Sequence, residues 1–206
     1  AVRAGVNRVA DVLVAGGARV ERHSPLLPDL AEAASLYMQF LFSGSTARFP
    51  VDAYEELQTQ ASALSADDHS LAAAQLRAMV LSHRDWIELN SRRELHRDRW
   101  RQLFREFDVV VCPITPTPAF PHDHNPDVLE RRLDVDGVQY PFFDQLVWAG
   151  LATMLGLPAT AVPTGPSPEG LPVGVQLIGP MFEDRTTLRL AELLEQRIGG
   201  FQPPGS

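Results

Sequence analysis

Several groups of residues in this 206-residue chain carry side chains that could do chemistry. His83, Arg84 and Asp85, with Asn90 after them, have the H-R-D-x-x-x-x-N spacing of a protein-kinase catalytic loop, in which the Asp accepts a proton and the Asn holds magnesium. The sequence has no glycine-rich phosphate loop, no D-F-G motif and no lysine, and these residues fall inside an expected helix. We interpret the match as a coincidence.

His122, Asp123 and His124 offer donor groups that metal ions accept. Adjacent residues seldom converge on one ion, and no further pair of ligands has a suitable spacing, so we expect a solvated loop and no metal site. Cys112 could act as a nucleophile, but a thiol at the end of an apolar strand and before Pro113 is more often a small buried side chain. It is the only cysteine, which excludes an intrachain disulfide.

The serines lack the partners that would activate them. None lies in a G-x-S-x-G turn, and Ser43-Gly44-Ser45 has no obvious base nearby in the sequence. All 18 basic residues are arginine. We therefore expect no catalytic residue in this chain. The arginines between Arg92 and Arg105 alternate with acidic residues at three- and four-residue steps, which favours a solvated helix face over an anion-binding surface.

The periodicity of apolar residues predicts alternating helices and single buried strands. Asp67-Asp68 is a capping signal for one long helix that continues to about Glu106. Five prolines between Pro113 and Pro126 predict a loop or a flexible lid. The other expected helices are 1–15, 29–42, one beginning near Val51, 142–155, and 186–198 capped by Asp184; a Gly-Ser break is expected at 43–45, and the expected strands are 18–21, 107–112, 159–162 and 173–178.

Composition excludes some classes of partner. The net charge of −8 disfavours nucleic-acid phosphates and anionic lipid, and no apolar stretch is long enough to span a membrane. Hydrophobic residues make up 45% and charged residues 21%, as in globular proteins. The single cysteine and the lack of a visible signal peptide lead us to expect a cytoplasmic protein.

The second half of the chain resembles the amidase-signature family in four segments. These are Phe107 to Pro113 with Thr115-Pro116; Gly156-Leu157-Pro158-Ala159 with Val162-Pro163-x-Gly165; Leu171 to Gly179; and the helix that begins near Asp184 with Leu188 and Leu190. Gly17-Ala18-x-Val20 resembles, more loosely, the helix-strand junction that follows the catalytic core of that family. The order and spacing of the four segments carry the resemblance.

The resemblance implies an α/β fold with a partly parallel mixed sheet flanked by helices, of which this chain is an incomplete half. The expected organisation is a C-terminal portion of an amidase domain over residues 1–206: a helix-strand-helix unit (1–50), a helical insertion (51–106) and the strand and helix segment with the family match (107–206). The chain opens in a helical pattern without a starting Met, so we expect a fragment of a longer enzyme.

The family's chemistry, by resemblance, is acyl transfer to a serine, with a second serine that relays a proton to a lysine and backbone N–H groups that stabilise the oxyanion. Such enzymes hydrolyse a carboxamide without metal or organic cofactor. In this chain the resemblance assigns Trp148 and Thr153 to the wall of the substrate pocket, although many relatives have Asn where Thr153 stands. Ordinary core packing explains either residue equally well.

Two alternatives remain open. The chain could belong to a non-catalytic accessory or binding protein that keeps the amidase fold, or to an amidotransferase subunit that supplies ammonia to a partner. The apolar run Leu146 to Ala149 argues against the second alternative, because a site for an amine would need polar contacts. An exposed sheet edge would also promote self-association.

Overall fold

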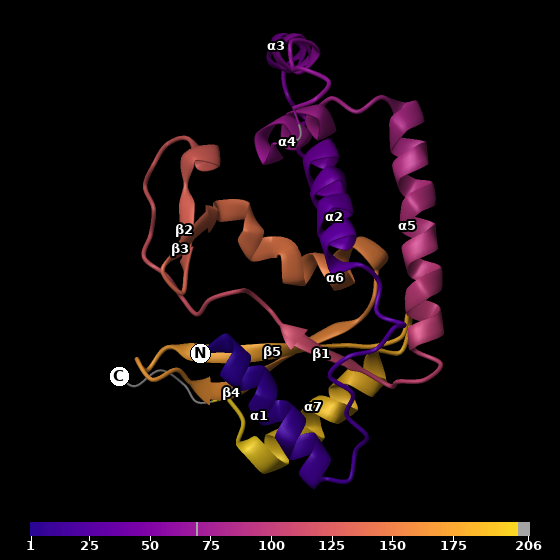
Figure 1. The fold of residues 1–206 in the computed structure, drawn as a ribbon, viewed down its shortest axis with the longest axis vertical. Helices are drawn as coiled ribbons and strands as arrows, with labels where there is room; N and C mark the ends of the chain where they lie inside the picture. The colour runs from indigo at the N-terminus through magenta and orange to yellow at the C-terminus, as the bar shows by residue number, and fades with distance from the viewer. Residues whose placement is uncertain (69, 202–206) are drawn as a thin grey trace.

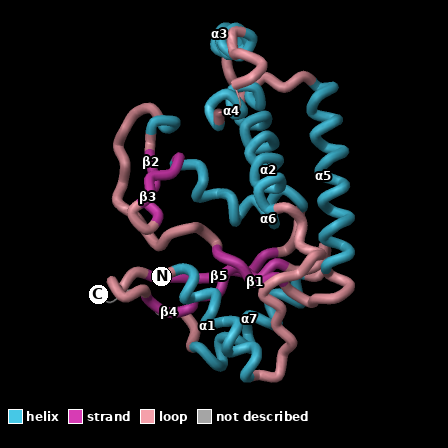
Figure 2. Tube along the Cα trace, viewed as in Figure 1, coloured by secondary structure: helices cyan, strands magenta, loops and turns pink. Residues whose placement is uncertain are grey.

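A computed structural model describes residues 1–68 and 70–201 (Figures 1 and 2). The elements, in chain order, are α1 (Val2–Ala15), α2 (Leu30–Ser45), α3 (Val51–Ser62), α4 (Leu71–Met79), α5 (His83–Leu103), β1 (Val110–Pro113), η1 (Val128–Glu130), β2 (Arg132–Val135), β3 (Val138–Pro141), η2 (Phe142–Leu146), α6 (Val147–Leu155), β4 (Ala159–Pro166), β5 (Pro172–Ile178) and α7 (Asp184–Ile198). Here η marks a short 3₁₀ helix. The expected α/β class is confirmed.

The main sheet has three strands in the order β1-β5-β4, so β5 lies in the centre. Both neighbours run antiparallel to β5, with Cys112 opposite Gln176 on one side and Thr160 opposite Leu177 on the other. The expectation of a partly parallel sheet is wrong for the strand pairs in the described residues, since both are antiparallel; for β4 and β5 the turn between them is too short for a parallel crossover. β1 and β4 run in the same direction but are not neighbours.

Helices cover the two faces of this sheet differently (Figure 1). Helices α1 and α7 pack on one face, where Val9 and Leu194 meet the buried strand residues Val175 and Leu177. The larger core lies on the other face and includes residues of α2, α5 and α6, with Ile178 from β5. Because side chains alternate along a strand, residues 176 and 178 face α6 while 175 and 177 face α1 and α7.

The expected long helix after Asp67 is wrong, since α4 and α5 are separate helices (Figure 2). Ser82 ends the connection between them: its hydroxyl oxygen accepts a hydrogen bond from the N–H of Asp85 at 3.1 Å and donates to the Asp85 carboxylate at 2.6 Å. This local arrangement satisfies the first turn of α5 and starts a new helix. Ser70, and not Asp67 or Asp68, caps α4.

Three smaller expectations also fail. Residues 18–21 form no strand, since no described strand pairs with them. The break at 43–45 is absent, since α2 continues through Ser45, and the hydroxyls of Ser43 and Ser45 donate to carbonyls of this helix. Asp184 lies in the first turn of α7 and does not cap it. An acidic side chain there still favours the helix through its dipole.

The loop after β1 is followed by a hairpin that the sequence analysis does not predict. Strands β2 and β3 pair in antiparallel register around Asp136 and Gly137, whose φ angles are 53° and 84°. Two consecutive positive φ angles are the requirement of a type I′ turn, and Asp-Gly is a preferred pair for it. Leu133 of β2 is buried, so the hairpin adds to the core near η2.

Candidate functional site

Helix α6 carries both residues that the sequence assigns to a pocket wall, but it presents them on different faces. Trp148 is half-buried and packs against the larger core. Thr153 is exposed, and its hydroxyl donates to the carbonyl of Ala149 at 2.9 Å. Five residues correspond to about 140° around a helix, so the two side chains cannot contact the same small group.

Glycines fix where α6 lies and where it ends. A Cβ atom on Gly150 would lie 2.4 Å from the Tyr37 ring, so only glycine allows α6 to approach α2 this closely. Gly156 ends the helix with a φ of 72° and a ψ of 32°, the left-handed conformation that favours glycine at a helix C-terminus. The N–H of Leu157 then bonds to the carbonyl of Ala152 at 3.1 Å, and β4 begins at Ala159.

A buried glutamine of the central strand joins α6 to the end of β1. The Gln176 side-chain amide donates to the carbonyl of Pro113 at 2.8 Å and to the carbonyl of Trp148 at 2.9 Å. Sequence reasoning used Gln176 only as part of a family segment. A polar residue within the apolar run Val173 to Ile178 was the signal that could have identified it, because a buried amide needs partners.

Cys112 does not have the properties of a nucleophile. It is 6% exposed, and burial raises the pKa of its thiol to about 12, although a hydrogen bond with Gln176 acts in the opposite direction. A thiol with such a pKa stays protonated at neutral pH, and the thiolate is the reactive form. The expectation of a small buried side chain is confirmed.

The other candidate groups have structural partners. Asp85 and His83 lie in the first turn of α5 and not in a loop, so the kinase-like spacing has no kinase-like geometry. His122 and His124 are exposed, while Asp123 accepts backbone bonds from Asn125 and Arg132. Among the described residues no three His, Cys, Asp or Glu side chains are grouped so that they could hold a metal ion.

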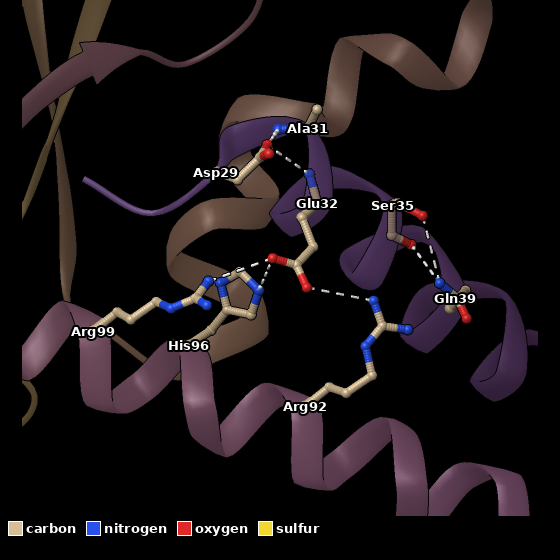
Figure 3. A network of polar contacts seen from close by, with 8 residues as sticks. All are labelled: Asp29, Ala31, Glu32, Ser35, Gln39, Arg92, His96 and Arg99. Carbon is tan, nitrogen blue, oxygen red and sulfur yellow. Dashed lines mark hydrogen bonds and ion pairs between the residues drawn. The ribbon is translucent and has the colours of Figure 1, made fainter. Parts of the chain in front are cut away.

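The arginine-rich helix α5 is a solvated face with local ion pairs, as expected. Arg97 pairs with Glu94 at 2.7 Å, and Arg101 pairs with Asp98. The sequence did not predict that Glu32 of α2 would collect a cluster from α5: Arg92 at 3.6 Å, Arg99 at 3.4 Å and the Nε2 atom of His96 at 3.4 Å (Figure 3). These contacts connect α2 to α5.

His96 is the buried member of this cluster, only 1% exposed. Burial lowers the pKa of its imidazole; Glu32 acts to raise it, and Arg99 and Arg92 act to lower it. The contact to Glu32 is long, and neither ring nitrogen has a hydrogen bond of good geometry in the described structure. Burial therefore favours the neutral form of His96, whose ring is buried beside Glu32 of α2.

The comparisons with known proteins decide the family. The model of the Amidase family matches residues 1–188. The chain belongs to the amidase family. A solved amidase structure superposes on this chain with a TM-score of 0.66 and 25% identity, over 96% of this chain and 42% of that structure. A glutamyl-tRNA(Gln) amidotransferase subunit from Thermotoga maritima gives a TM-score of 0.67 at 23% identity, over 98% and 41%.

The curated relatives of this amidase-family chain include amidotransferase subunits. A glutamyl-tRNA(Gln) amidotransferase subunit from Xanthobacter autotrophicus is 39% identical over 110 residues, which are 53% of this chain and 20% of the relative. The corresponding protein of Mesorhizobium japonicum is 38% identical over 96 residues, 47% of this chain and 17% of the relative. The matched part thus spans about a fifth of these relatives and about two fifths of the solved structures.

Proposed function

We propose that this chain is the C-terminal part of an amidase that hydrolyses a carboxamide C–N bond through an acyl-serine intermediate. In this proposal, residues 1–206 supply the fold and one wall of the pocket, and the catalytic residues lie elsewhere in the enzyme. The observation that carries the proposal is the family match over residues 1–188 of a chain that contains no lysine. The expected division at residues 50 and 106 remains part of the proposal.

Side-chain chemistry supports the view that this chain alone is inactive. Acyl transfer needs an activated nucleophile and a base. The Cys112 thiol is protonated, and the hydroxyls of Ser43 and Ser45 donate to carbonyls of their own helix. Without the nucleophile and base, the reaction loses the several kcal/mol of barrier lowering that each part of the complete site supplies, which together correspond to many orders of magnitude in rate.

An ammonia-release assay tests this proposal. The purified 206-residue chain should release no ammonia from simple aliphatic or aryl amides. A polypeptide expressed with the coding sequence upstream of Ala1 should contain a Gly/Ser-rich segment with a lysine and should release ammonia. Turnover by the 206-residue chain itself would refute the proposal that the catalytic residues lie elsewhere in the enzyme.

Trp148 and Thr153 are the proposed contacts with a small amide substrate. The half-buried indole of Trp148 offers an apolar surface to an acyl or aryl group. Thr153 has already used its proton for Ala149, so its hydroxyl can only accept a hydrogen bond from a substrate N–H while that bond persists. The two residues would then contact different parts of the molecule. We propose no metal or organic cofactor.

An amidotransferase subunit is the second candidate function, because the curated relatives carry that name. The apolar character of Leu146 to Ala149 favours hydrolysis, since these residues give the amine of a substrate no polar partner. The two functions differ in the fate of ammonia. Release into solution by the polypeptide that includes this chain supports the amidase, whereas transfer of the ammonia to a glutamyl-tRNA acceptor, where it forms a new amide, supports the amidotransferase.

A non-catalytic accessory protein is the third candidate. A solved protein described as part of a vestigial protein complex related to the origins of an s-triazine catabolic enzyme has this fold, with a TM-score of 0.69 at 23% identity. The upstream coding sequence distinguishes this candidate as well. A family domain without the lysine and the serines would favour it over the amidase.

The open edge of β1 supports the proposal that the isolated chain associates with a second copy. β1 pairs only with β5 in the described sheet, and a groove of about 820 Å³ lies beside it, lined by Val109 to Val111 and by apolar residues of α1 and α7. Unpaired strand edges promote pairing between chains. Sedimentation should show association with rising concentration, reduced in Val109→Lys; a monomer at every concentration would contradict this.

No helix in the described ranges is long and apolar enough to cross a membrane. The high pKa and burial of the single thiol, Cys112, give no sign of disulfide chemistry. On this basis we propose the cytoplasm as the compartment and neither nucleic acid nor a membrane as a partner, consistent with the net charge of −8.

A further inference from the structure

Gln176 occupies a position where a strand of this kind would ordinarily have an apolar residue. It lies in the centre of β5 between Val175 and Leu177, both 0% exposed, and is itself 6% exposed. A buried primary amide is costly unless its donors and acceptor are used. The Gln176 side chain uses both of its N–H groups, one for Pro113 and one for Trp148.

The partners of Gln176 come from elements that are distant in sequence. Pro113 is the last residue of β1 and lies 63 residues away; Trp148 is the second residue of α6 and lies 28 residues away. The register partner of Gln176 in β1 is Cys112, the residue before Pro113. One amide therefore links the centre of the sheet, the end of its edge strand and the start of α6.

Apart from the backbone pairing of β1 with β5 and the bond from Arg97 to the carbonyl of Leu155 at 2.9 Å, the segments that Gln176 holds pack largely through apolar contacts. The residues before η2 and α6, Pro141 and Leu146, make no side-chain capping bond. Their main contacts are apolar, such as the edge-to-face pair of Phe42 and Phe143, and apolar contacts tolerate sliding better than directional hydrogen bonds do. β1 is four residues long and continues into the proline-rich loop that begins at Ile114.

We propose that Gln176 is a positioning residue for the substrate pocket of the amidase: its amide sets the separation and register between Trp148 on α6 and the loop that follows β1. This proposal rests on the proposed function, in which these two segments form the acyl side of the pocket. It assigns Gln176 no contact with substrate. Its effect is transmitted through the two carbonyl groups that it holds.

Amide hydrogen exchange of the 206-residue chain tests the linkage directly. Gln176→Met retains length and apolar packing but removes both donors. We expect it to speed exchange together in residues 110–112 and 148–153 by about 5- to 30-fold relative to α7, the factor expected for losing one to two net hydrogen bonds in a local opening.

Thr187→Val is the matched control. Thr187 is 1% exposed on α7 and is hydrogen-bonded to Thr160 at 2.8 Å and to the carbonyl of Asp184 at 2.9 Å, on the other face of the sheet. The control should leave residues 110–112 and 148–153 as protected, relative to the global stability of the variant, as in the wild-type chain. If Gln176→Met accelerates exchange evenly over the chain, or not at all, Gln176 has only a structural role and the proposal is wrong.

Gln176→Glu separates hydrogen bonding from size. An ionised carboxylate cannot donate to the two carbonyls, whereas a protonated one can donate to one of them. The exchange rates of this variant, relative to wild type at the same pH, should be nearer to wild type at pH 5.5 than at pH 8.5. Equal ratios at the two pH values would count against a donor role.

Kinetics of a polypeptide that contains this chain and has amidase activity provide the functional readout. Gln176→Met should raise KM for the amide by several-fold more than it lowers kcat, because a misplaced wall weakens substrate binding and leaves the reacting groups intact. An equal KM would contradict the positioning role. If no such polypeptide has amidase activity, the proposed function is wrong, but the hydrogen-exchange experiment still tests whether Gln176 links β1 to α6.

Discussion

The central strand β5 and the longest helix α5 are held in place by different physical interactions. β5 has four consecutive buried residues, Val175 to Ile178, with apolar contacts on both faces of the sheet. α5 is 21 residues long but buries only Leu89, His96, Trp100 and Leu103, and much of its remaining surface carries ion pairs. The buried residues of β5 therefore pack against helices on both faces of the sheet, whereas most side chains of α5 are exposed or only partly buried.

Truncating a side chain in each element gives the largest contrast. Leu177→Ala in β5 should lower the free energy of unfolding by about 2–5 kcal/mol, because a fully buried leucine leaves a cavity. Leu95→Ala in α5 removes the same atoms from a residue that is 60% exposed and should change stability by less than about 0.5 kcal/mol. Urea denaturation of both variants measures the difference; equal losses would show that α5 packs against a surface that its exposure does not reveal.

One substitution, at Gly150, should disrupt the close packing between α6 and α2. Gly150→Ala would place a Cβ atom 2.4 Å from the Tyr37 ring, so α6 must move away from α2 at a cost of about 1–3 kcal/mol. In a Tyr37→Ala background the ring is absent, and adding Gly150→Ala should cost little further. A double-mutant cycle by thermal or urea unfolding tests this coupling, and additive losses would mean that another contact limits α6.

Two glycines near helix ends, Gly156 and Gly44, test the contribution of backbone conformation to stability. Gly156→Ala forces a Cβ into a left-handed conformation at the end of α6 and should cost about 1–2 kcal/mol. Gly44→Ala, near the end of α2, meets no atom within 4 Å and should be neutral or stabilise by up to about 0.5 kcal/mol, since alanine favours the helix. Opposite signs of the change in melting temperature are the expected result.

The smallest expected effect is a pH dependence from α5. Burial depresses the pKa of His96 in the folded chain, so the unfolded chain binds a proton that the folded chain resists. Stability contributed by neutral His96 is present above the ordinary histidine pKa and is lost as the pH falls through the range between that value and the depressed one. His96→Gln should remove this loss.

The measurement is the free energy of unfolding of wild type and His96→Gln between pH 7 and pH 5. The difference in free energy of unfolding between the two proteins should change with pH by no more than the slope for binding one proton. Wild type should lose stability relative to the variant as the pH falls. A difference of the opposite sign would show that Glu32 outweighs burial and holds the imidazole charged.

Much of the candidate site can be predicted from residue types. The apolar run of β5, the glycine after α6 and the isolated Cys112 before proline each predict their own structure, because burial, a positive φ and desolvation depend mainly on the residue and its nearest neighbours. The Asp136-Gly137 turn carries the same kind of local signal, but no element is predicted for residues 127–141, because strands of four residues show too little alternation to be recognised.

The sequence by itself determined the α/β class, the family resemblance of residues 107–197, and the absence of a lysine base, since these depend on composition and on local patterns along the chain. Only the tertiary structure decided that β5 is the central strand of an antiparallel sheet, that α4 and α5 are separate helices, and that Gln176 joins Pro113 to Trp148. Strand order, helix breaks and side-chain hydrogen bonds across 28 or 63 residues depend on which segments meet in space, and no short stretch of sequence contains that information.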